Sequence, residues 1–363
     1  MNSAAGLEAY GFLPAMRAAL DARGSIVEIP ARVTAVHKER YALVSERGEC
    51  FARLKSAVYF NGGMQEFPTT GDFVLIAYNE QGDSTITETL PRRSLFARKN
   101  PTLGEGDQVV AANFDSVFIM QSLNHDLNPK RLERYLTLAW QSGALPVVVL
   151  TKADLVDSYA QQRNDILRVA AGCDVFAVSA KTGYGFDELR DYLKPGKTIV
   201  LLGSSGVGKS SFVNALAGET IMAVNEIRED DSKGRHTTTH RQLIRMNSGV
   251  MIIDTPGMRE LGMLDAAAGL SESFADVERY FPLCRFSDCN HEREPGCAVQ
   301  AAIAAGELPL SRFASYQKLQ RESQYAASQT DYLKRKQQRT TEIAKFSKAL
   351  QKSGGKRGSY IDD

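Results

Sequence analysis

The segment GSSGVGKS at residues 203–210 is the feature that most constrains how this chain can fold. It matches the phosphate-loop pattern G-x-x-x-x-G-K-[ST] in full, with the apolar run TIVLL before it and SSFVNALAG after it. We therefore expect a buried strand, a glycine-rich loop and a helix, in which backbone N–H groups and the helix N-terminus hold phosphate oxygens. This arrangement predicts an α/β fold that binds a nucleotide.

Individual side chains of this loop have separate expected roles. Lys209 reaches the β and γ phosphate oxygens and supports hydrolysis, while the hydroxyl of Ser210 binds Mg²⁺. The other residues that we expect to contact the phosphates are Gly203, Ser204, Ser205, Gly206, Val207, Gly208 and Ser211.

A second motif, DTPG at residues 254–257, follows another apolar run. Asp254 is expected to hold Mg²⁺, directly or through water, and the N–H of Gly257 to contact the γ-phosphate. The polar, hydroxyl-rich segment REDDSKGRHTTTHRQ lies between the two motifs. One of the three threonines at 237–239 is predicted to bind Mg²⁺ there, and Thr238 is the favoured one.

The base-reading residues are predicted from TKAD at 151–154, which follows the apolar run ALPVVVL. The carboxylate of Asp154 can accept both guanine N1–H and the exocyclic amine, a pairing that adenine does not offer, and Lys152 packs along the base. Ser179 and Ala180 follow the strand-like run DVFAV, and this segment supplies a backbone N–H to guanine O6. Thr151 stands where Asn is usual and makes only part of its contacts, which predicts somewhat relaxed base selectivity.

The order of these motifs is rotated relative to an ordinary GTPase, because the base-reading loop precedes the phosphate loop. Each motif follows a predicted strand, so all of them should meet at one edge of a parallel sheet. A sheet tolerates this order when the old termini are joined and new ones are opened at a surface connection. The sequence therefore predicts a circularly permuted P-loop GTPase domain with a largely parallel sheet.

A candidate metal site follows, in the segment CRFSDCNHEREPGC. Cys284, Cys289, His291 and Cys297 offer three thiolates and an imidazole, a set that favours tetrahedral Zn²⁺. Because the segment is too polar to bury much apolar surface, a metal would hold it folded. All four positions are filled by protein, which indicates one structural ion.

Changes of pattern along the chain predict five parts. Short alternating runs at 30–98 indicate a five-stranded barrel of the OB type, and PRRSLFARKNP after them reads as a linker with a basic face. Alternating strands and helices indicate the GTPase domain at 99–269, and a helical zinc-binding domain follows at 270–331. Residues 1–29 form an extension with a short helix and no assigned function, and residues 332–363 form a basic helix and tail.

Composition excludes several classes of protein. The hydrophobic content of 43% and charged content of 24% are typical of a soluble globular protein, and a net charge of +1 gives no overall electrostatic bias. No apolar run approaches the ~20 residues that cross a bilayer, and MNSAAGLEAYGF lacks the pattern of a secretory signal. We expect a cytoplasmic monomer with no membrane partner.

Taken together, the rotated motif order, GRHTTTH at 234–240, and CRFSDCNHEREPGCAV soon after DTPGMRELG resemble the ribosome small subunit-dependent GTPase A (RsgA) family. The resemblance covers roughly residues 30–320. It implies an N-terminal OB-fold, a permuted GTPase domain, a C-terminal zinc-binding domain, and the 30S subunit with its 16S rRNA as partners. The implied role is late maturation of the 30S particle, with hydrolysis of GTP to GDP stimulated by the subunit. The nearly neutral N-terminus departs from the family, so rRNA contacts are expected to shift to the basic C-terminus.

The source of the catalytic group is a further expectation. Met258 occupies the place, just after DTPG, where Ras-like enzymes carry the Gln that orients water. A thioether cannot do this, and we hypothesise that His236 supplies the missing group when the ribosome orders its segment. Two alternatives stay open at this point: a GTP-regulated RNA-binding module with incidental hydrolysis, and a P-loop ATPase or kinase, against which the TKAD and SAK motifs argue.

Overall fold

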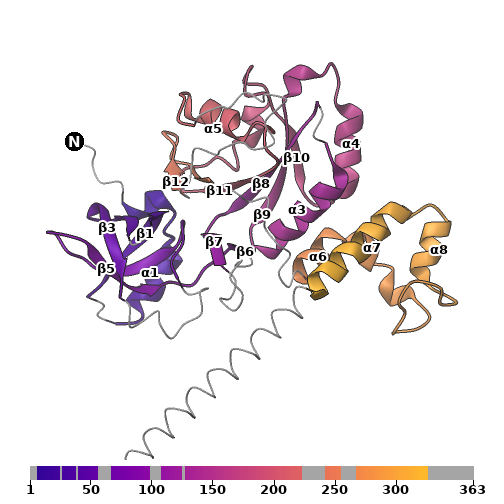
Figure 1. Cartoon of the computed structure of the whole chain (residues 1–363), viewed down its shortest axis with the longest axis horizontal. Coiled ribbons are helices and arrows are strands. Elements are labelled where there is room, and N and C mark those ends of the chain that lie inside the picture. Colours follow the sequence, from indigo (N-terminus) through magenta and orange to yellow (C-terminus); the bar gives the residue numbers. More distant parts are fainter. Residues whose placement is uncertain are drawn as a thin grey trace, which may run out of the picture.

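The computed structural model describes residues 6–24, 27–37, 40–55, 67–98, 108–124, 127–222, 242–254 and 267–325. Figure 1 shows three parts: an N-terminal barrel, a central sheet flanked by helices, and a C-terminal helical module beside α3. Among the described helices, none is long and apolar enough to cross a membrane.

Five strands form the barrel, at the five places where the sequence predicts them. They are β1 (Ile29–Val36), β2 (Tyr41–Ser45), β3 (Gly48–Leu54), β4 (Phe73–Ala77) and β5 (Ser84–Thr89). Their order is β1-β2-β3-β5-β4, and β4 pairs again with β1, so the sheet closes on itself. Alternate residues such as Ala31, Val33, Leu43 and Ile86 face inward and form its core.

The N-terminal segment packs on this barrel. It contains the short helix η1 (Leu7–Tyr10) and the predicted helix, α1 (Pro14–Asp21). Leu7 and Phe12 are almost fully buried, and the ring of Phe12 lies 5.3 Å from that of Phe73 in β4. This segment therefore covers the barrel rather than extending from it.

The prediction that residues 91–101 form a linker with a basic face was wrong for residues 91–98, the part that the structure describes. It contains β6 (Leu95–Arg98), which pairs antiparallel with β7 (Gln108–Ala112), and Phe96 is buried. Arg92 does not present a free basic face, because both oxygens of the buried Asp72 accept from it at 2.8 and 2.7 Å. The apolar anchor and the buried ion pair make this segment a part of the fold, while Lys99 lies outside the described residues.

The central sheet has the order β10-β9-β8-β11-β13-β12. Its strands are β8 (Ser116–Ser122), β9 (Leu145–Thr151), β10 (Asp174–Ala177), β11 (Thr198–Leu202), β12 (Gln242–Arg245) and β13 (Met251–Asp254). All are parallel except β12, which runs antiparallel to β13 because a five-residue turn joins the two. The prediction of a largely parallel sheet is confirmed.

Helices cover both faces of this sheet (Figure 1). They are α3 (Pro129–Gln141), α4 (Ala160–Val169), η4 (Phe186–Leu189) and α5 (Lys209–Ala217). Successive side chains of β9 point to opposite faces of the sheet, so each face has its own layer of helices. Val148 and Leu150 pack with α3 and α4 on one face, and Val147 and Val149 pack with η4 and α5 on the other. The chain reaches the central strand β11 only after the edge strand β10, as a permuted order requires.

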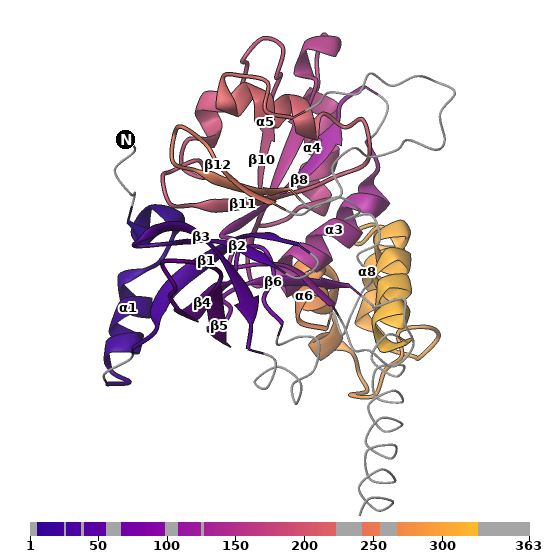
Figure 2. The same cartoon turned by 60° about the vertical axis from the view of Figure 1, so that its left-hand side comes forward.

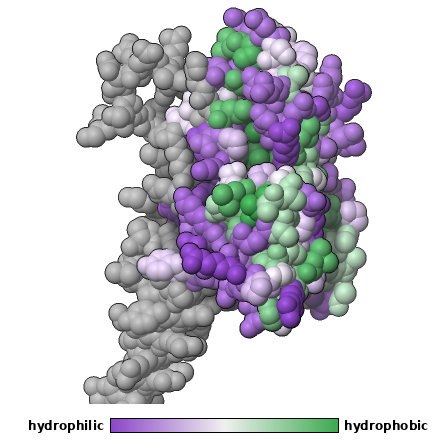
Figure 3. All heavy atoms as spheres, turned by 90° about the vertical axis from the view of Figure 1, so that its right-hand side faces the viewer, coloured by the Kyte–Doolittle hydropathy of each residue, from purple (hydrophilic) through white to green (hydrophobic). Residues whose placement is uncertain are grey.

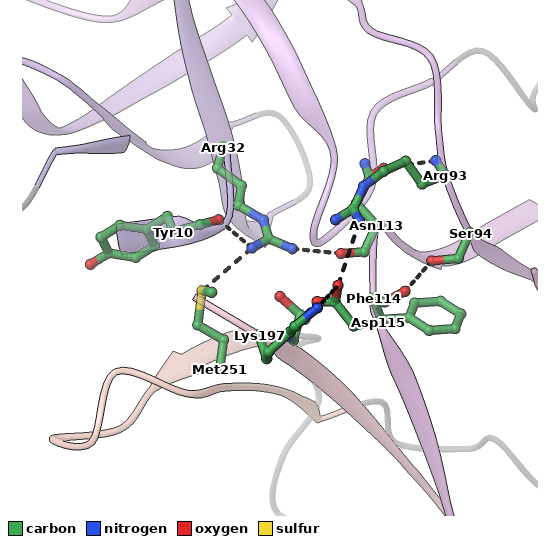
Figure 4. Close-up of polar contacts among 10 residues, drawn as sticks. Tyr10, Arg32, Arg93, Ser94, Asn113, Phe114, Asp115, Lys197 and Met251 are labelled. Carbon is green, nitrogen blue, oxygen red and sulfur yellow. Dashed lines mark hydrogen bonds and ion pairs between the residues drawn. The ribbon is translucent and has the colours of Figure 1, made fainter. Parts of the chain in front are cut away.

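The barrel and the central sheet are joined by backbone pairing and by one buried cation. Ala35 of β1 pairs with Gln242 of β12, which makes one continuous sheet of 11 strands. The fully buried Arg32 donates to the carbonyls of Tyr10 and Asn113, and its Nη1 lies 3.4 Å from the sulfur of Met251 (Figure 4). Its Nε also donates to the carbonyl of Gly71 at 3.2 Å. Burial lowers the pKa of Arg32 to about 9, so the guanidinium stays charged at neutral pH.

The C-terminal module consists of short helices. They are α6 (Ala267–Ser273), α7 (Ala275–Glu278), η6 (Phe281–Leu283), α8 (Ala298–Ala304) and a helix at 310–325. The module has its own core, which includes Phe274, Val277, Val299 and Tyr316. Figure 3 shows the face that it shares with α4, on which apolar residues form small patches among hydrophilic ones.

This module docks closely on α3, as Figure 2 also shows. A Cβ added at Gly269 would lie 2.3 Å from the carbonyl oxygen of Thr137, so only glycine permits this contact between α6 and α3. Arg312 donates to Glu133 of α3 at 2.9 Å, and both side chains are buried. Asp276 and the Ser273 carbonyl also accept from Arg312, which ties the docking contact to the module itself.

Candidate nucleotide site and metal centre

Parallel strands bring the predicted motifs to one edge of the central sheet. The base-reading loop follows β9, Ser179 follows β10, the phosphate loop follows β11, and Asp254 ends β13. These strands run in the same direction, so their carboxyl ends lie side by side. In α/β sheets this is the edge at which ligands bind.

The phosphate loop has the backbone that its glycines require. Gly206 and Gly208 adopt φ values of 70° and 106°, which glycine adopts at little cost. A Cβ added at Gly203 would lie 2.8 Å from the carbonyl oxygen of Met120 in β8, so the loop can approach that strand only with glycine. Lys209 Nζ donates to the carbonyls of Gly203 and Ser204 at 2.7 Å each, which holds the ammonium group over the loop.

Thr151 connects the base-reading loop to the phosphate loop. Its Oγ1 lies 2.6 Å from the carbonyl oxygen of Val207 and 3.3 Å from that of Gln121 in β8. The side chain of Val207 is itself buried in the core beside Phe212. The sequence predicted that Thr151 makes part of the contacts of the usual Asn. Its hydrogen bond to the Val207 carbonyl shows that the phosphate loop is one of the segments it contacts.

A second hydroxyl connects the two predicted guanine-binding segments. Ser179 is fully buried, and its Oγ donates to Oδ1 of Asp154 at 2.7 Å while accepting from the N–H of Thr182. The N–H of Ala153 also donates to the Val178 carbonyl at 3.1 Å. Ser179 thus orients the carboxylate of Asp154 from the protein interior, while Asp154 itself is exposed to solvent at the edge of the sheet.

The predicted magnesium ligands are described only in part. Ser210 lies in the first turn of α5, and Asp254 is the last residue of β13, one residue beyond Ile253, which pairs with Val200 of β11. The strand that leads to the phosphate loop, β11, is the neighbour of β13, and hydroxyl and carboxylate oxygens suit Mg²⁺. The side chain of Asp254 lies outside the described residues, as do His236, Thr238 and Gly257 entirely.

The four predicted metal ligands come together in the C-terminal module. The three thiols and one imidazole nitrogen of Cys284, Cys289, His291 and Cys297 lie within 4.8 Å of one another. His291 Nδ1 lies 3.4 Å from the sulfur of Cys284 and 3.6 Å from that of Cys297. A tetrahedral ion with bonds of about 2.3 Å needs ligand atoms about 3.8 Å apart, and the two distances from His291 are close to this spacing. The cluster could therefore hold a tetrahedral metal ion such as Zn²⁺.

Other residues that the sequence did not single out position these ligands. The His291 ring stacks on Phe281 with ring centroids 4.2 Å apart, and Gln300 Nε2 donates to the His291 carbonyl at 2.6 Å. The carboxylate of Glu294 accepts from the N–H groups of Asn290, Glu292 and Arg293. Its own backbone N–H and these donors lower the pKa of Glu294 to about 2. In the sequence, only the position of Glu294 directly before a Pro-Gly turn could have indicated that its carboxylate holds this loop.

The fold and the site define a circularly permuted GTPase, and comparison with known proteins gives the family. The sequence model of the RsgA GTPase family matches residues 89–264. "Small ribosomal subunit biogenesis GTPase RsgA 1" of Listeria innocua is 47% identical over 88% of this chain and 90% of its own length. A relative from Methanosarcina acetivorans, named RsgA, is 42% identical over 80% of this chain and 79% of its own length. The chain belongs to the RsgA GTPase family.

Solved structures give the same fold. YjeQ from Thermotoga maritima is 29% identical, with a TM-score of 0.60 over 80% of this chain and 97% of that structure. YloQ, described as a circularly permuted GTPase, is 24% identical with a TM-score of 0.55 over 81% of this chain and 94% of that structure. The ABC transporter family model also matches residues 186–352, a range that contains the phosphate loop.

Proposed function

We propose that this GTPase acts on the small ribosomal subunit and assists its late maturation, hydrolysing GTP to GDP with stimulation by the subunit. The observation that carries the proposal is the 47% identity to a protein named for small ribosomal subunit biogenesis, over nearly the whole of both chains. That alignment of 321 residues is much longer than the segment at 89–264 that the family model matches. Proteins that are this similar over most of both chains are expected to share their partner.

In this proposal the nucleotide lies along the carboxyl edge of the central sheet. Asp154 and Lys152 contact the guanine base with help from Ser179 and the Ala180 backbone, and the loop at 203–211 holds the phosphates. Ser210, Asp254 and Thr238 would hold Mg²⁺, which neutralises charge on the phosphates when bound. The Cys284, Cys289, His291 and Cys297 cluster supports one structural Zn²⁺.

The catalytic group is proposed to be His236, because Met258 cannot orient water. His236→Ala should abolish subunit-stimulated GTP turnover and keep the nucleotide affinity. His240→Ala, in the same segment, is the matched control and should retain stimulation. Normal stimulation of His236→Ala would refute this assignment.

Contacts with 16S rRNA are proposed for the barrel and the basic C-terminal segment. The barrel's strand order, β1-β2-β3-β5-β4 closed by β4–β1, supports an OB-fold, a fold that binds oligonucleotides. Residues 332–363 carry nine Lys and Arg residues against three acidic ones, which favours phosphate contacts. Binding of a cytoplasmic monomer to the subunit should then weaken with salt, and a chain ending at residue 331 should show a smaller salt dependence.

One experiment separates this proposal from its alternatives. GTP and ATP turnover are measured with and without purified 30S subunits, with Lys209→Ala as the blank. The proposal predicts a GTP rate that rises strongly with 30S subunits. Tight GTP binding without stimulation would favour an RNA-binding module with incidental hydrolysis, and preference for ATP would favour an ATPase or kinase.

A further inference from the structure

We propose that Tyr159 and Tyr184 are positioning residues for guanine recognition, because a hydrogen bond between their hydroxyl groups ties together the two loops that read the base. The inference rests on the nucleotide site of the proposed function and adds to it a determinant of base selectivity. It concerns the free protein and needs no ribosomal subunit.

The two tyrosines belong to different base-reading loops. Tyr159 ends the loop that begins at Lys152 and carries Asp154, and it is the N-cap of α4. Tyr184 ends the loop that begins at Ser179. The two hydroxyl oxygens lie 2.7 Å apart, an ordinary distance for an O–H···O hydrogen bond. This bond raises the pKa of Tyr159, so the Tyr159 phenol stays protonated and able to donate at neutral pH.

Hydrogen bonds of the second loop connect this pair to the base-reading carboxylate. The N–H of Ser179 donates to the Tyr184 carbonyl at 3.0 Å, and Ser179 Oγ donates to Asp154 at 2.7 Å. The N–H of Tyr184 also donates to Oγ1 of Thr182, whose own N–H donates to Ser179 Oγ. The two loops are therefore joined at two places, by Ser179 and Asp154 on the inner side and by the tyrosine pair on the outer side.

The backbone around Tyr184 makes the outer connection important. Gly183 and Gly185 adopt φ values of 79° and 77°, and glycine restricts the backbone so little that the chain on either side of Tyr184 can change conformation at low cost. Tyr184 is 49% exposed, so packing holds it weakly. Tyr159 is held better, because it is partly buried against the core that includes Ile166 of α4. The hydrogen bond thus fixes Tyr184 relative to the better-held tyrosine.

The orientation of Asp154 matters more for guanine than for a base with fewer donors. A carboxylate can accept from guanine N1–H and from the exocyclic amine together, whereas hypoxanthine offers only its N1–H. Two parallel hydrogen bonds require a closer alignment of the carboxylate than one does. Loops that are free to shift should therefore lose affinity for guanine and keep most of their affinity for hypoxanthine.

The experiment measures the dissociation constants of GDP and of IDP, its hypoxanthine analogue, for the full-length protein by competition against fluorescently labelled GDP. Tyr159→Phe and Tyr184→Phe each keep the ring and remove one hydroxyl. Each should weaken GDP binding about fivefold, the effect of one lost hydrogen bond, and IDP binding less than about twofold. The double variant should match the single ones, because either change alone breaks the bond. Tyr325→Phe, at an exposed tyrosine of the C-terminal module, is the matched control and should bind both nucleotides like the wild type.

The outcomes distinguish this inference from a merely structural role and from failure of the proposed function. Both hydroxyls lie at the surface, so the Phe variants leave no buried polar group unpaired and should fold. The inference is overturned if either single variant keeps the wild-type affinity for GDP, or if GDP and IDP binding weaken equally, as a general loosening of the site would cause. Losses that multiply in the double variant would also overturn it, since the two hydroxyls would then act independently. A wild-type protein that binds neither nucleotide would instead refute the proposed nucleotide site.

Discussion

Two buried hydroxyls organise the candidate nucleotide site at the scale of single residues. Thr151 binds the phosphate loop through the Val207 carbonyl, and Ser179 binds the carboxylate of Asp154 at 2.7 Å. Because the Ser179 bond is made to an ionised acceptor, it is stronger than a bond between neutral groups. The three loops are therefore ordered with respect to one another by side chains that need not touch the nucleotide.

The hydroxyl of Ser179 gives a prediction at this scale. Ser179→Ala should weaken GDP binding about tenfold, because Asp154 loses the donor that fixes its orientation toward the base. Titration calorimetry measures the affinity. Ser158→Ala is the matched control, since Ser158 lies exposed in the connection to α4 and should bind GDP like the wild type. Equal affinities for both variants would contradict the assigned role of Ser179.

At the scale of elements, Arg32 joins the barrel to the central sheet. Its donors reach carbonyls of the N-terminal segment and of the connection between β7 and β8 (Figure 4), and a further one in the turn before β4. Nearby, Asp115 accepts from Lys197 at 3.2 Å and from the backbone of Thr198 at 2.9 Å. The turn before β4 packs so closely that a Cβ at Gly71 would lie 2.1 Å from the carbonyl oxygen of Ala112.

Removing this cation should therefore destabilise the whole chain. Arg32→Met keeps much of the side-chain volume but removes the donor to the Tyr10 and Asn113 carbonyls and one of two donors to the Gly71 carbonyl, which should lower the free energy of unfolding by about 3 kcal/mol. Urea denaturation followed by circular dichroism measures this change. Arg47→Met, at an exposed arginine of the same barrel, should change it by less than about 0.5 kcal/mol. Similar losses in both variants would contradict the role given to Arg32.

The Cys284, Cys289, His291 and Cys297 cluster of the C-terminal module gives a second prediction at this scale. Native mass spectrometry should find one zinc ion per chain, and Cys289→Ser should lose it because three ligands hold the ion less well than four. Hydrogen exchange at residues 281–297 should then accelerate, since the metal supplies much of the folding energy of such a segment. Cys50→Ser is the control, because Cys50 lies outside the cluster, and this variant should keep the zinc ion. A zinc-free wild-type protein with the same slow exchange would refute the metal assignment.

Local pattern decides which of these features could be predicted from the sequence. The phosphate loop, the Asp154 and Ser179 segments and the cysteine cluster were predictable because each is a short motif beside a recognisable strand or helix. Arg32 was not, because its partners lie 22 to 219 residues away and no local pattern marks a buried cation bonded to carbonyls. For the same reason β6 was read as a linker, and the run RQLIRM gave no indication that β12 is antiparallel.

At the scale of the whole molecule, β12 lies between the barrel and the nucleotide site. Gln242 pairs with Ala35 of the barrel on one side and with Asp254 on the other, so a single backbone row runs from β1 to the end of β13. On the opposite side of the molecule, the C-terminal module docks on α3 through Gly269 and the buried Arg312–Glu133 pair (Figure 1). Both flanking parts thus contact the GTPase domain directly.

The central claim is that GTP hydrolysis by this chain serves maturation of the small subunit, and one measurement tests it most directly. In cells depleted of the protein, the fraction of small subunits that carry unprocessed 16S rRNA is measured by gradient fractionation and primer extension. We predict that this fraction rises on depletion, returns to normal with the wild-type chain, and stays high with Lys209→Ala. Unchanged rRNA processing after depletion, or full rescue by Lys209→Ala, would contradict the account.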